Sequence, residues 1–461
     1  MRSHASSPSR QDEIVSATIL WFRQDLRLAD HPALRAAISR GKPIIPVFLW
    51  CPQEEGEWAP GGASRWWLHQ SLSALSKDLE KSGSKLVIRR VDDSLSAIKK
   101  LLRETGADAV YWSRRYEPLV IERDRRIKET LRQADVEVRS FNAALLIEPW
   151  DVQNLSGKPF QVFTPFWRKV VGTLDPPAPL PAPKHIAPPA KWPSSVKIES
   201  LDLMPQIVWY EGMARTWLPG ERGAKRHLET FLDGPVKDYG ETRNLPAQPG
   251  TSRLSPHLHF GEISPRQIWH AAPKWRGSQF MAEIGWREFA HHLLYHFPRT
   301  TNEPLRADFQ RFPWREDSRE LQAWQRGNTG IPLVDAGMRE LWETGWMHNR
   351  VRMVVASFLV KNLRMHWLHG ARWFWDTLVD ADLASNTLGW QWAAGCGADA
   401  APYFRVFNPE SQAEKFDPQS EYIQRWLPEL SGKSAKSYPA PIVDLKASRE
   451  SALAAFKTLR K

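Results

Sequence analysis

Between residues 17 and 145 the chain alternates short β-branched runs with amphipathic segments of helical spacing. Strands that are separated by helices pair in parallel, with helices covering both faces of the sheet. The expected strands are ATILWF at 17–22, KPIIPVFLW at 42–50, KLVIRR at 85–90, DAVYWS at 108–113 and VEVRSF at 136–141, with helices near 32–40, 64–82, 94–105 and 117–133. We predict a Rossmann-like, doubly wound five-stranded sheet over 16–147, with a ligand crevice at the carboxyl ends of its strands.

The turn after the first expected strand reads WFRQDLRLAD and lacks the pattern GxGxxG. Those glycines let a backbone approach a pyrophosphate at the start of a helix. A dinucleotide bound in the Rossmann manner is therefore not expected in this α/β domain.

A proline-dense segment divides the chain. Eight prolines lie between Pro176 and Pro193, a density that excludes regular helix and favours an extended, semi-rigid connector. Long helical periods rich in Trp, Arg and His follow, and 461 residues exceed the size of a single core. We predict a disordered arm at 1–15, the α/β domain at 16–147, a linker at 148–221, an all-α domain at 222–430 and a C-terminal tail at 431–461.

The charge balance points to an anionic partner. The chain has 63 Lys and Arg against 52 Asp and Glu, a net charge of +11, which favours a polyanion or an acidic membrane surface. No apolar run approaches the roughly 18–20 residues that span a bilayer. The only cysteines, Cys51 and Cys396, exclude a disulfide framework and suit a reducing cytoplasm. The 24 tryptophans indicate stacking sites or electron routes in addition to packing.

The segment MAEIGWREFAHHLLYH at 281–296 has the spacing of a helix. Glu283, Trp286, Arg287 and Ala290 stand at i, i+3, i+4 and i+7, so they share one face. Such a face can stack a base and hydrogen-bond its edge. The alternative is a Glu283–Arg287 ion pair on a solvated face, and the spacing by itself does not decide between the two.

The segment WMHNRVRMVVASFLVKNL at 346–363 repeats this design. Asn349, Arg352, Met353 and Ala356 share a face, and they offer an amide, a charge and a soft apolar wall to a heterocycle. The two helices are expected to form opposite walls of one cavity. A buried structural network is the alternative, and it requires a carboxylate partner for the arginine.

The segment LVDADLASNTLGWQWAAG offers carboxylates that can pair with Arg352. Asp380 is predicted to pair with Arg352, while Asp382 accepts hydrogen bonds from a ring imide or a ribose. Two close carboxylates also suggest a metal, but Mg²⁺ and Ca²⁺ gather more oxygen ligands than this segment offers, so no metal is predicted. General acid–base chemistry by the pair is a weaker alternative.

A polar turn, TSRLSPHLHFGEIS at 251–264, precedes an expected helix. Its hydroxyls and backbone N–H groups suit a phosphate or pyrophosphate. Serine and threonine at a helix start are, however, more often caps.

The chain resembles the photolyase/cryptochrome family in these motifs, in order: TSRLSPHLHFGEIS, EIGWREF, AWQRGNTGIPLVDAGMRELWETGWMHNRVRM, DADLASNTLGWQWAAG and APYFRVFNPESQAEKFDP. The similarity extends from WFRQDLRLADHPAL at 21 to RWLPEL at 425. It implies a U-shaped FAD in the helical domain. The residues implied to hold FAD are Tyr239, Thr251, Ser252, Arg253, Leu254, Ser255, Arg287, Asn349, Arg352, Asp380, Ala381, Asp382 and Asn386, with Asn386 facing flavin N5.

The resemblance also implies a reaction. Light-excited FADH⁻ would inject an electron into a flipped-out cyclobutane pyrimidine dimer in DNA and recover it after bond scission; extrusion costs least at a lesion that is already poorly stacked. The implied dimer pocket is Glu283, Trp286, Asn349, Met353 and Trp392, with Glu283, Trp286, Asn349 and Asn386 as the catalytic set. Arg350 and Arg405 match positions that touch DNA phosphates. Trp390, Trp367 and Trp314 match an indole chain that reduces the flavin under light, for which core packing is the alternative.

Relatives within the family differ in function. Plant-type cryptochromes carry Asp at the position of Asn386, depart at Trp286 and Asn349, and have a long tail; (6-4) photolyases carry a His pair where this chain has Asn349 and Arg350. The chain is most similar to the class III bacterial photolyases, and a flavin photoreceptor without repair activity is the alternative. A light-independent nucleic-acid binder would need an empty flavin pocket.

The resemblance implies further a second, antenna chromophore in the α/β domain. Methenyltetrahydrofolate is preferred to a deazaflavin, with Glu117 as a contact, although a Glu at a helix start equally suits the helix dipole. We expect a cytoplasmic monomer that acts on DNA and binds no membrane.

Overall fold

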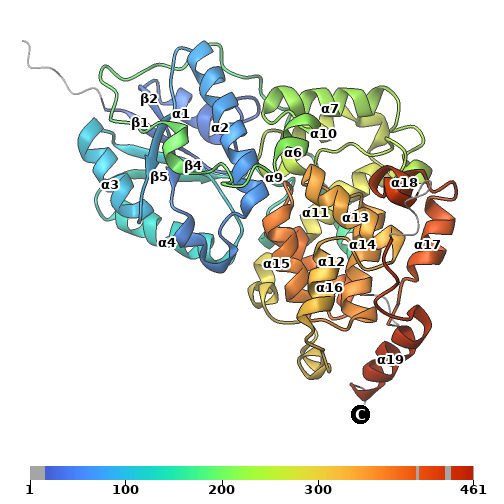
Figure 1. The fold of residues 1–461 in the computed structure, drawn as a ribbon. Coiled ribbons are helices and arrows are strands. Elements are labelled where there is room, and N and C mark those ends of the chain that lie inside the picture. The colour runs from blue at the N-terminus through green and yellow to red at the C-terminus, as the bar shows by residue number, and fades with distance from the viewer. Residues whose placement is uncertain (1–15, 401–403, 431–437, 460–461) are drawn as a thin grey trace, which may run out of the picture.

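The computed structural model describes residues 16–400, 404–430 and 438–459. An α/β domain lies beside a larger helical domain (Figure 1). The predicted arm at 1–15 and part of the predicted tail lie outside the described residues. Within the described residues no helix is both long and apolar enough to cross a lipid bilayer.

All five predicted strands form, and they pair in parallel in the order β3-β2-β1-β4-β5. β1 is central, with Thr18 opposite Ile44 on one side and Ala109 on the other. The bounds are β1 Thr18–Phe22, β2 Ile44–Trp50, β3 Val87–Arg90, β4 Ala109–Ser113 and β5 Glu137–Phe141, with helices α1 Pro32–Ser39, η1 Pro52–Trp58, α2 Gly62–Lys81, α3 Ser94–Thr105 and α4 Pro118–Arg132.

The alternation of side chains along each strand creates two cores. Leu20 and Phe22 of β1 face a core that α1 and α2 complete, whereas Ile19 and Trp21 face a core completed by α3 and α4. Successive strand residues point to opposite faces, so a strand that is covered on both sides reads as a continuous apolar run. This explains why the short apolar runs of the sequence predicted the sheet well.

The segment predicted as a linker, 148–221, has two different parts. Its proline-rich stretch contains no helix or strand and lies against the α/β domain, where Ile44 N donates to Ala187 O at 2.9 Å and Ile186 is fully buried. The remaining part contains η2 Pro149–Asp151, α5 Phe163–Thr173, η3 Ile198–Leu201 and α6 Glu211–Thr216. The apolar face of α5 packs on the helical domain, so this part is not a simple spacer.

The helical domain has a large apolar core. Its elements are α7 Glu221–Asp233, α8 Tyr239–Thr242, α9 Ser255–His259, α10 Pro265–Ala271, η4 Pro273–Trp275, α11 Gln279–His296, η5 Pro298–Thr301, η6 Ala307–Arg311, α12 Ser318–Gln325, α13 Pro332–Thr344, α14 Asn349–Ser357, the π-helix η7 Phe358–Asn362, α15 Trp367–Thr377, α16 Leu383–Ala394, α17 Pro409–Phe416, α18 Glu421–Trp426, η8 Pro428–Leu430 and α19 Leu445–Thr458. Residues of α7, α9, α10 and α11 contribute to a second apolar cluster of this domain. The helix α19 lies in the predicted tail and was not foreseen; Asp444 caps it, and it packs on η7.

The loop after β1 joins the two domains. The buried guanidinium of Arg27 donates to the carbonyls of Gly261 at 2.8 Å and Ala143 at 2.9 Å. Gly261 has φ +64°, and a side chain there would overlap the backbone of Gln24 and Asp25. Where a Rossmann domain would carry its glycine-rich loop, this chain therefore carries a domain contact.

Candidate functional site

The predicted pair of Arg352 and Asp380 is present. Arg352 Nη2 lies 2.8 Å from Asp380 Oδ2 and 3.1 Å from Oδ1. The same carboxylate accepts from Ser255 Oγ at 2.6 Å, and its side chain is only 3% exposed. These charged and hydroxyl donors satisfy the buried carboxylate, and through them Asp380 joins the polar turn before α9 to α14.

Helix caps at His348 and Asp382 fix where α14 and α16 begin. The α-helix predicted over 346–363 begins at Asn349, because His348 Nδ1 accepts from Arg350 N at 3.2 Å, and it passes into a π-helix at 358–362. α16 begins after Asp382, whose Oδ1 accepts from Ser385 N at 2.8 Å. α11 and α14 both pack against α16, which brings the motifs of the sequence analysis into one region.

The second oxygen of Asp382 faces two histidines. Oδ2 lies 3.4 Å from His291 Nε2 and 3.8 Å from His259 Nδ1. Burial acts to raise the pKa of Asp382, but His291, His259 and Arg287 outweigh it and hold that pKa well below its usual range. The two carboxylates thus have separate partners: Asp380 pairs with an arginine, and Asp382 faces two histidines. Asp382 stays ionised and acts as a hydrogen-bond acceptor.

Glu283 does not pair with Arg287, so the alternative of a local ion pair is wrong. Glu283 Oε1 lies 2.6 Å from Arg243 Nη1 and accepts from Gln279 Nε2 at 2.8 Å. Arg287 instead donates to the carbonyl of Ala144 at 2.6 Å. Arg243 was missed in the sequence analysis, although it stands one helical turn after Tyr239 and its guanidinium lies 5.6 Å from that ring.

Trp286 has an aromatic partner from the segment predicted as linker. Its ring stacks on Phe163 of α5, with centroids 3.8 Å apart and planes 11° apart. Gly285 permits α5 to pack closely on α11, because a Cβ there would overlap the indole of Trp167 of α5. Trp286 remains half-buried, so α5 supports the indole without covering it. Across the site, Trp392 lies 6.0 Å from Phe407.

Three arginines, Arg243, Arg350 and Arg405, lie beside Glu283 and are called the arginine cluster. Arg350 donates to Asn244 Oδ1 at 2.6 Å and lies over Phe416. Burial lowers the pKa of Arg350, and the positive charges of Arg243 and Arg405 lower it further. Arg405 and Asn349 are exposed, while Met353 is half-buried. Three like charges in proximity are costly unless an anion is near, so this cluster is suited to a polyanion.

The polar turn forms as expected before α9. Thr251 and Ser252 are half-buried, Leu254 is buried, and Ser255 remains exposed although it bonds the buried Asp380. Arg253 has φ +53° and its guanidinium lies 4.6 Å from Trp217 and 4.7 Å from Trp346. The indoles hold the guanidinium of Arg253 in place, and its Nε has no partner among the described residues, so this nitrogen and the hydroxyls are the groups open to a ligand.

Asn386 connects α16 to α15. Its Nδ2 donates to Ala371 O at 3.0 Å, and the neighbouring Ala381 is buried. The three predicted electron-route indoles differ in exposure: Trp390 is 2% and Trp367 1% exposed, whereas Trp314 is half-buried. Trp390 packs on α15 at Gly370, where any Cβ would overlap its ring.

The residues suit a large anionic cofactor with a heterocycle and a hydroxylated chain. Hydroxyls of Thr251, Ser252 and Ser255 offer donors to phosphates, and the ionised Asp382 offers an acceptor to ring or sugar hydrogens. Two buried nitrogens nearby, Arg253 Nε and His348 Nε2, have no hydrogen-bond partner among the described residues. Buried polar groups normally find partners, so the site is chemically complete only with a polar ligand or water.

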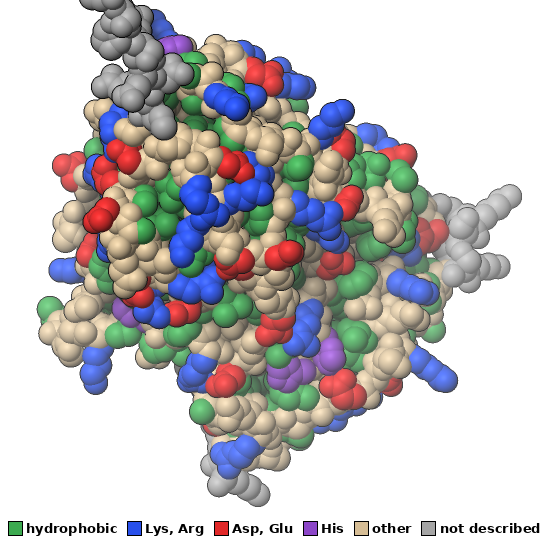
Figure 2. All heavy atoms as spheres, turned by 90° about the vertical axis from the view of Figure 1, so that its left-hand side faces the viewer, with side chains coloured by type: hydrophobic (Ala, Val, Ile, Leu, Met, Phe, Trp, Pro, Cys, Tyr) green, Lys and Arg blue, Asp and Glu red, His purple; other side chains and the backbone are tan. Residues whose placement is uncertain are grey.

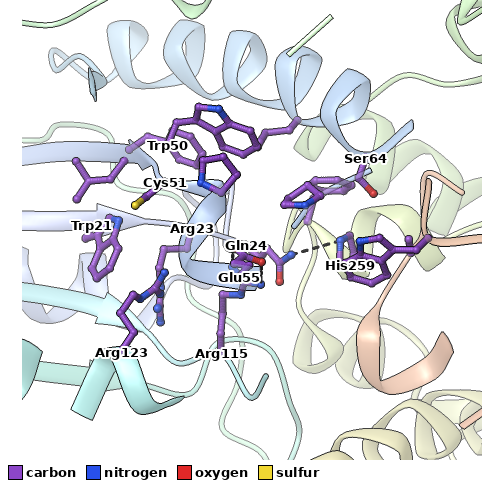
Figure 3. A pocket seen from close by; sticks show the side chains of 18 residues that line it. Trp21, Arg23, Gln24, Trp50, Cys51, Glu55, Ser64, Arg115, Arg123 and His259 are labelled. Carbon is purple, nitrogen blue, oxygen red and sulfur yellow. Dashed lines mark hydrogen bonds and ion pairs between the residues drawn. The ribbon is translucent and has the colours of Figure 1, made fainter. Parts of the chain in front are cut away.

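A cavity lies at the carboxyl ends of β1 and β2, where the sequence predicts a crevice (Figure 3). His259 and Ala381 of the helical domain also line it. It encloses about 680 Å³, part of it open to solvent. Trp21, Trp50, Arg23 and Arg115 line it, and Gln24 contacts His259 of the helical domain at 3.3 Å. Glu117 reaches the cavity lining through Arg115, at 2.8 Å.

The face of the α/β domain in Figure 2 carries basic and acidic side chains interspersed. Exposed ion pairs also occur in the α/β domain, such as those of Arg125 with Glu122 and Glu129. A polyanion would meet no uniform basic surface there. The arginine cluster beside Glu283 is therefore the better anion site.

Known proteins share both domains. Residues 18–184 match the family DNA photolyase, and residues 280–437 match the FAD binding domain of DNA photolyase. The chain is 47% identical over 477 residues to a deoxyribodipyrimidine photo-lyase of Agrobacterium fabrum, covering 97% of this chain and 99% of that protein. It is 41% identical to cryptochrome-1 of Arabidopsis thaliana, over 90% of this chain and 63% of that protein.

The fold of this chain also matches that of a solved structure. A crystal structure of a bacterial class III photolyase from Agrobacterium tumefaciens superposes with a TM-score of 0.93 at 46% identity, covering 100% of both chains. Similarity of this extent includes every element that positions the site described above.

Proposed function

Because this chain belongs to the photolyase/cryptochrome family, we propose that it is a deoxyribodipyrimidine photo-lyase. It uses blue light and reduced FAD to split cyclobutane pyrimidine dimers in DNA. The observation that supports this most directly is the group formed by Glu283 and Trp286 on α11, Asn349 and Met353 on α14, and Trp392 on α16, with the arginine cluster beside it.

In this proposal the residues of the dimer pocket bind an extruded lesion. Trp286 and Trp392 stack against the two pyrimidines, and Glu283 accepts hydrogen bonds from a pyrimidine edge. The ion pair with Arg243 at 2.6 Å orients the carboxylate of Glu283. Arg350 and Arg405 contact phosphates, which provides affinity that is independent of base sequence.

The flavin site follows from the polar turn and the two carboxylates. Tyr239, Thr251, Ser252, Leu254 and Ser255 surround the phosphates and ribityl chain; Arg287, Arg352, Asp380, Ala381, Asp382, Asn349 and Asn386 surround the ring system. Reduced FAD supplies, on excitation, the electron that opens the cyclobutane ring. The fixed dipoles around it require little reorganisation when charge moves. Asn386 would present an uncharged amide to flavin N5. Plant cryptochromes carry Asp at this position, so the amide favours a repair enzyme.

We propose further that electrons pass from the half-buried Trp314 through Trp367 to Trp390 and then to the flavin. The cavity at β1 and β2 is the proposed place of an antenna chromophore, with methenyltetrahydrofolate as the preferred occupant and Glu117 acting through Arg115. Extraction of the purified protein followed by mass spectrometry identifies that occupant: a deazaflavin or a second flavin would replace the folate in this proposal. The protein acts as a monomer, which its elution volume on a sizing column checks.

The experiment that tests the function is light-dependent repair. Purified protein with chemically reduced flavin is mixed with UV-irradiated oligo(dT), and dimers are counted after blue light and after darkness. We expect dimers to disappear only under light. A yellow protein that leaves the dimers unchanged would instead support a flavin photoreceptor, the function suggested by the similarity to cryptochrome-1.

Replacing Glu283 by alanine is expected to slow repair while leaving FAD bound. A hydrogen bond to a charged group contributes about 1.5–3 kcal/mol, so repair at limiting substrate should fall roughly 10- to 100-fold. Glu283→Gln, which keeps one acceptor, should lose less. Repair rates and the flavin-to-protein absorbance ratio are the measurements.

The matched control is Gln279→Ala, which removes the other hydrogen-bond partner of Glu283. It should repair nearly as well as the parent protein. Release of flavin by Glu283→Ala would contradict the role given to this carboxylate, because Glu283 would then belong to the cofactor site.

A further inference from the structure

His366 lies in contact with two indoles of the proposed electron route. Its ring centroid is 5.6 Å from that of Trp367, with the planes 30° apart, and 5.2 Å from that of Trp314, with the planes 70° apart. Trp367 is buried and Trp314 is half-buried. The imidazole thus stacks on the inner indole and meets the outer one edge-to-face, so it joins them as a third ring.

The backbone around His366 holds these rings together. After the π-helix η7, Arg364 adopts φ +53° and turns the chain. Met365 then forms a parallel β-bridge with Arg315, and Arg315 N donates to Arg364 O at 2.8 Å. His366 directly follows one side of this bridge and Trp314 directly precedes the other. Their contact is therefore set by main-chain pairing between distant segments.

The imidazole is fixed in orientation and in charge. His366 caps α15, with Nδ1 accepting from Leu368 N at 3.2 Å, so the proton of the neutral ring resides on Nε2. Burial lowers the pKa of His366 to about 4; His369 and Arg372 also lower it, and Glu316 opposes them. At neutral pH the ring next to both indoles is uncharged.

We propose that His366 is a positioning residue for electron transfer from Trp314 to Trp367: a fixed aromatic ring that couples the two indoles. The inference rests on the proposed function, because light-excited FAD is the oxidant that starts the transfer. In this step one electron leaves Trp314 and reduces the radical cation of Trp367. Trp314 then releases its indole N–H proton to solvent, and no other bond forms or breaks.

An uncharged ring is required at this position for two reasons. A radical cation on either indole would be repelled by a positive charge about 5–6 Å away. A small aliphatic side chain, by contrast, would remove the ring contacts that link Trp314 with Trp367. The side chain must therefore be both aromatic and neutral, and the cap at α15 keeps it there.

Three substitutions separate these requirements. His366→Asn keeps a good helix cap and removes the ring, His366→Phe keeps a neutral ring and loses the cap, and His366→Lys introduces a charge. His369→Asn is the matched control, since His369 is one turn away and bonds Glu316 at the surface. Each flavin-loaded variant, with the flavin oxidised, receives a blue flash, and the yield of long-lived tryptophan radical is followed by transient absorption.

The expected result is a several-fold lower radical yield in His366→Asn and a loss of about tenfold or more in His366→Lys, where charge repulsion is added. His366→Phe and His369→Asn should give nearly the parental yield, although His366→Phe should melt at a lower temperature. A parental yield in His366→Asn would overturn the proposal, and so would an equal loss in His366→Phe and His366→Asn.

Repair by chemically reduced enzyme distinguishes this proposal from the proposed function. That reaction does not use the indole route, so all four variants should split dimers as the parent protein does. If the reduced parent protein fails to repair, the proposed function fails, while the flash experiment still decides the role of His366.

Discussion

Protein in which Asp380 is replaced by alanine will purify with little or no flavin and will unfold at a lower temperature. Asp380 is the only carboxylate that contacts Arg352 within hydrogen-bond distance among the described residues, at 2.8 Å and 3.1 Å, and it also binds Ser255 Oγ. Removing it leaves the partly buried guanidinium of Arg352 without its counter-charge. Loss of one member of a buried ion pair lowers the free energy of unfolding by roughly 3–5 kcal/mol. Because the Arg352 side chain is 24% exposed, we expect a loss near the lower end of this range.

A second variant separates stability from cofactor binding. Arg352→Met combined with Asp380→Ala removes both charges, so the thermal stability of the flavin-free protein should recover in part. FAD binding should not recover, because two polar contacts of the site are gone. Thermal melting and the flavin-to-protein absorbance ratio are measured for both variants and for Asp380→Asn. Full flavin content in Asp380→Ala would show that this pair does not belong to the cofactor site.

The fold was largely predictable because its signals are local. Five buried strands appear as five apolar runs, and each connecting helix shows its own periodicity. The pair of Arg352 and Asp380 was predictable as well, since a buried arginine needs a carboxylate and α16 offers one. These inferences require only neighbouring residues and a general rule about burial.

The errors arise where a distant segment decides the outcome. Local spacing left a Glu283–Arg287 ion pair open as an alternative. In the structure Glu283 pairs with Arg243, and Arg287 donates to the carbonyl of Ala144. Phe163, the partner of Trp286, comes from a segment predicted as linker. The β-bridge that brings Trp314 to His366 has no periodic signal. Such contacts depend on tertiary packing, which a single sequence does not display.

Replacing Trp286 by alanine is expected to weaken binding of dimer-containing DNA selectively. Stacking a base on an aromatic side chain contributes about 1–3 kcal/mol, so affinity for the lesion should fall roughly 5- to 150-fold. Affinity for undamaged DNA should hardly change, since it depends on phosphate contacts. Fluorescence anisotropy with dimer-containing and undamaged oligonucleotides, at one fixed salt concentration, measures the difference.

Two further variants test how Trp286 acts. Phe163→Ala removes the ring 3.8 Å from Trp286 without touching the proposed lesion, so it should produce a smaller loss of the same selectivity. Trp342→Ala, which removes an indole that is 48% exposed on α13, is the matched control and should bind both DNAs as the parent does. Equal losses for damaged and undamaged DNA in Trp286→Ala would contradict a stacking role, because a phosphate-dependent effect cannot discriminate a dimer. If Phe163→Ala reproduces part of the selective loss of affinity for dimer-containing DNA, the indole of Trp286 that Phe163 supports is the group that recognises the dimer.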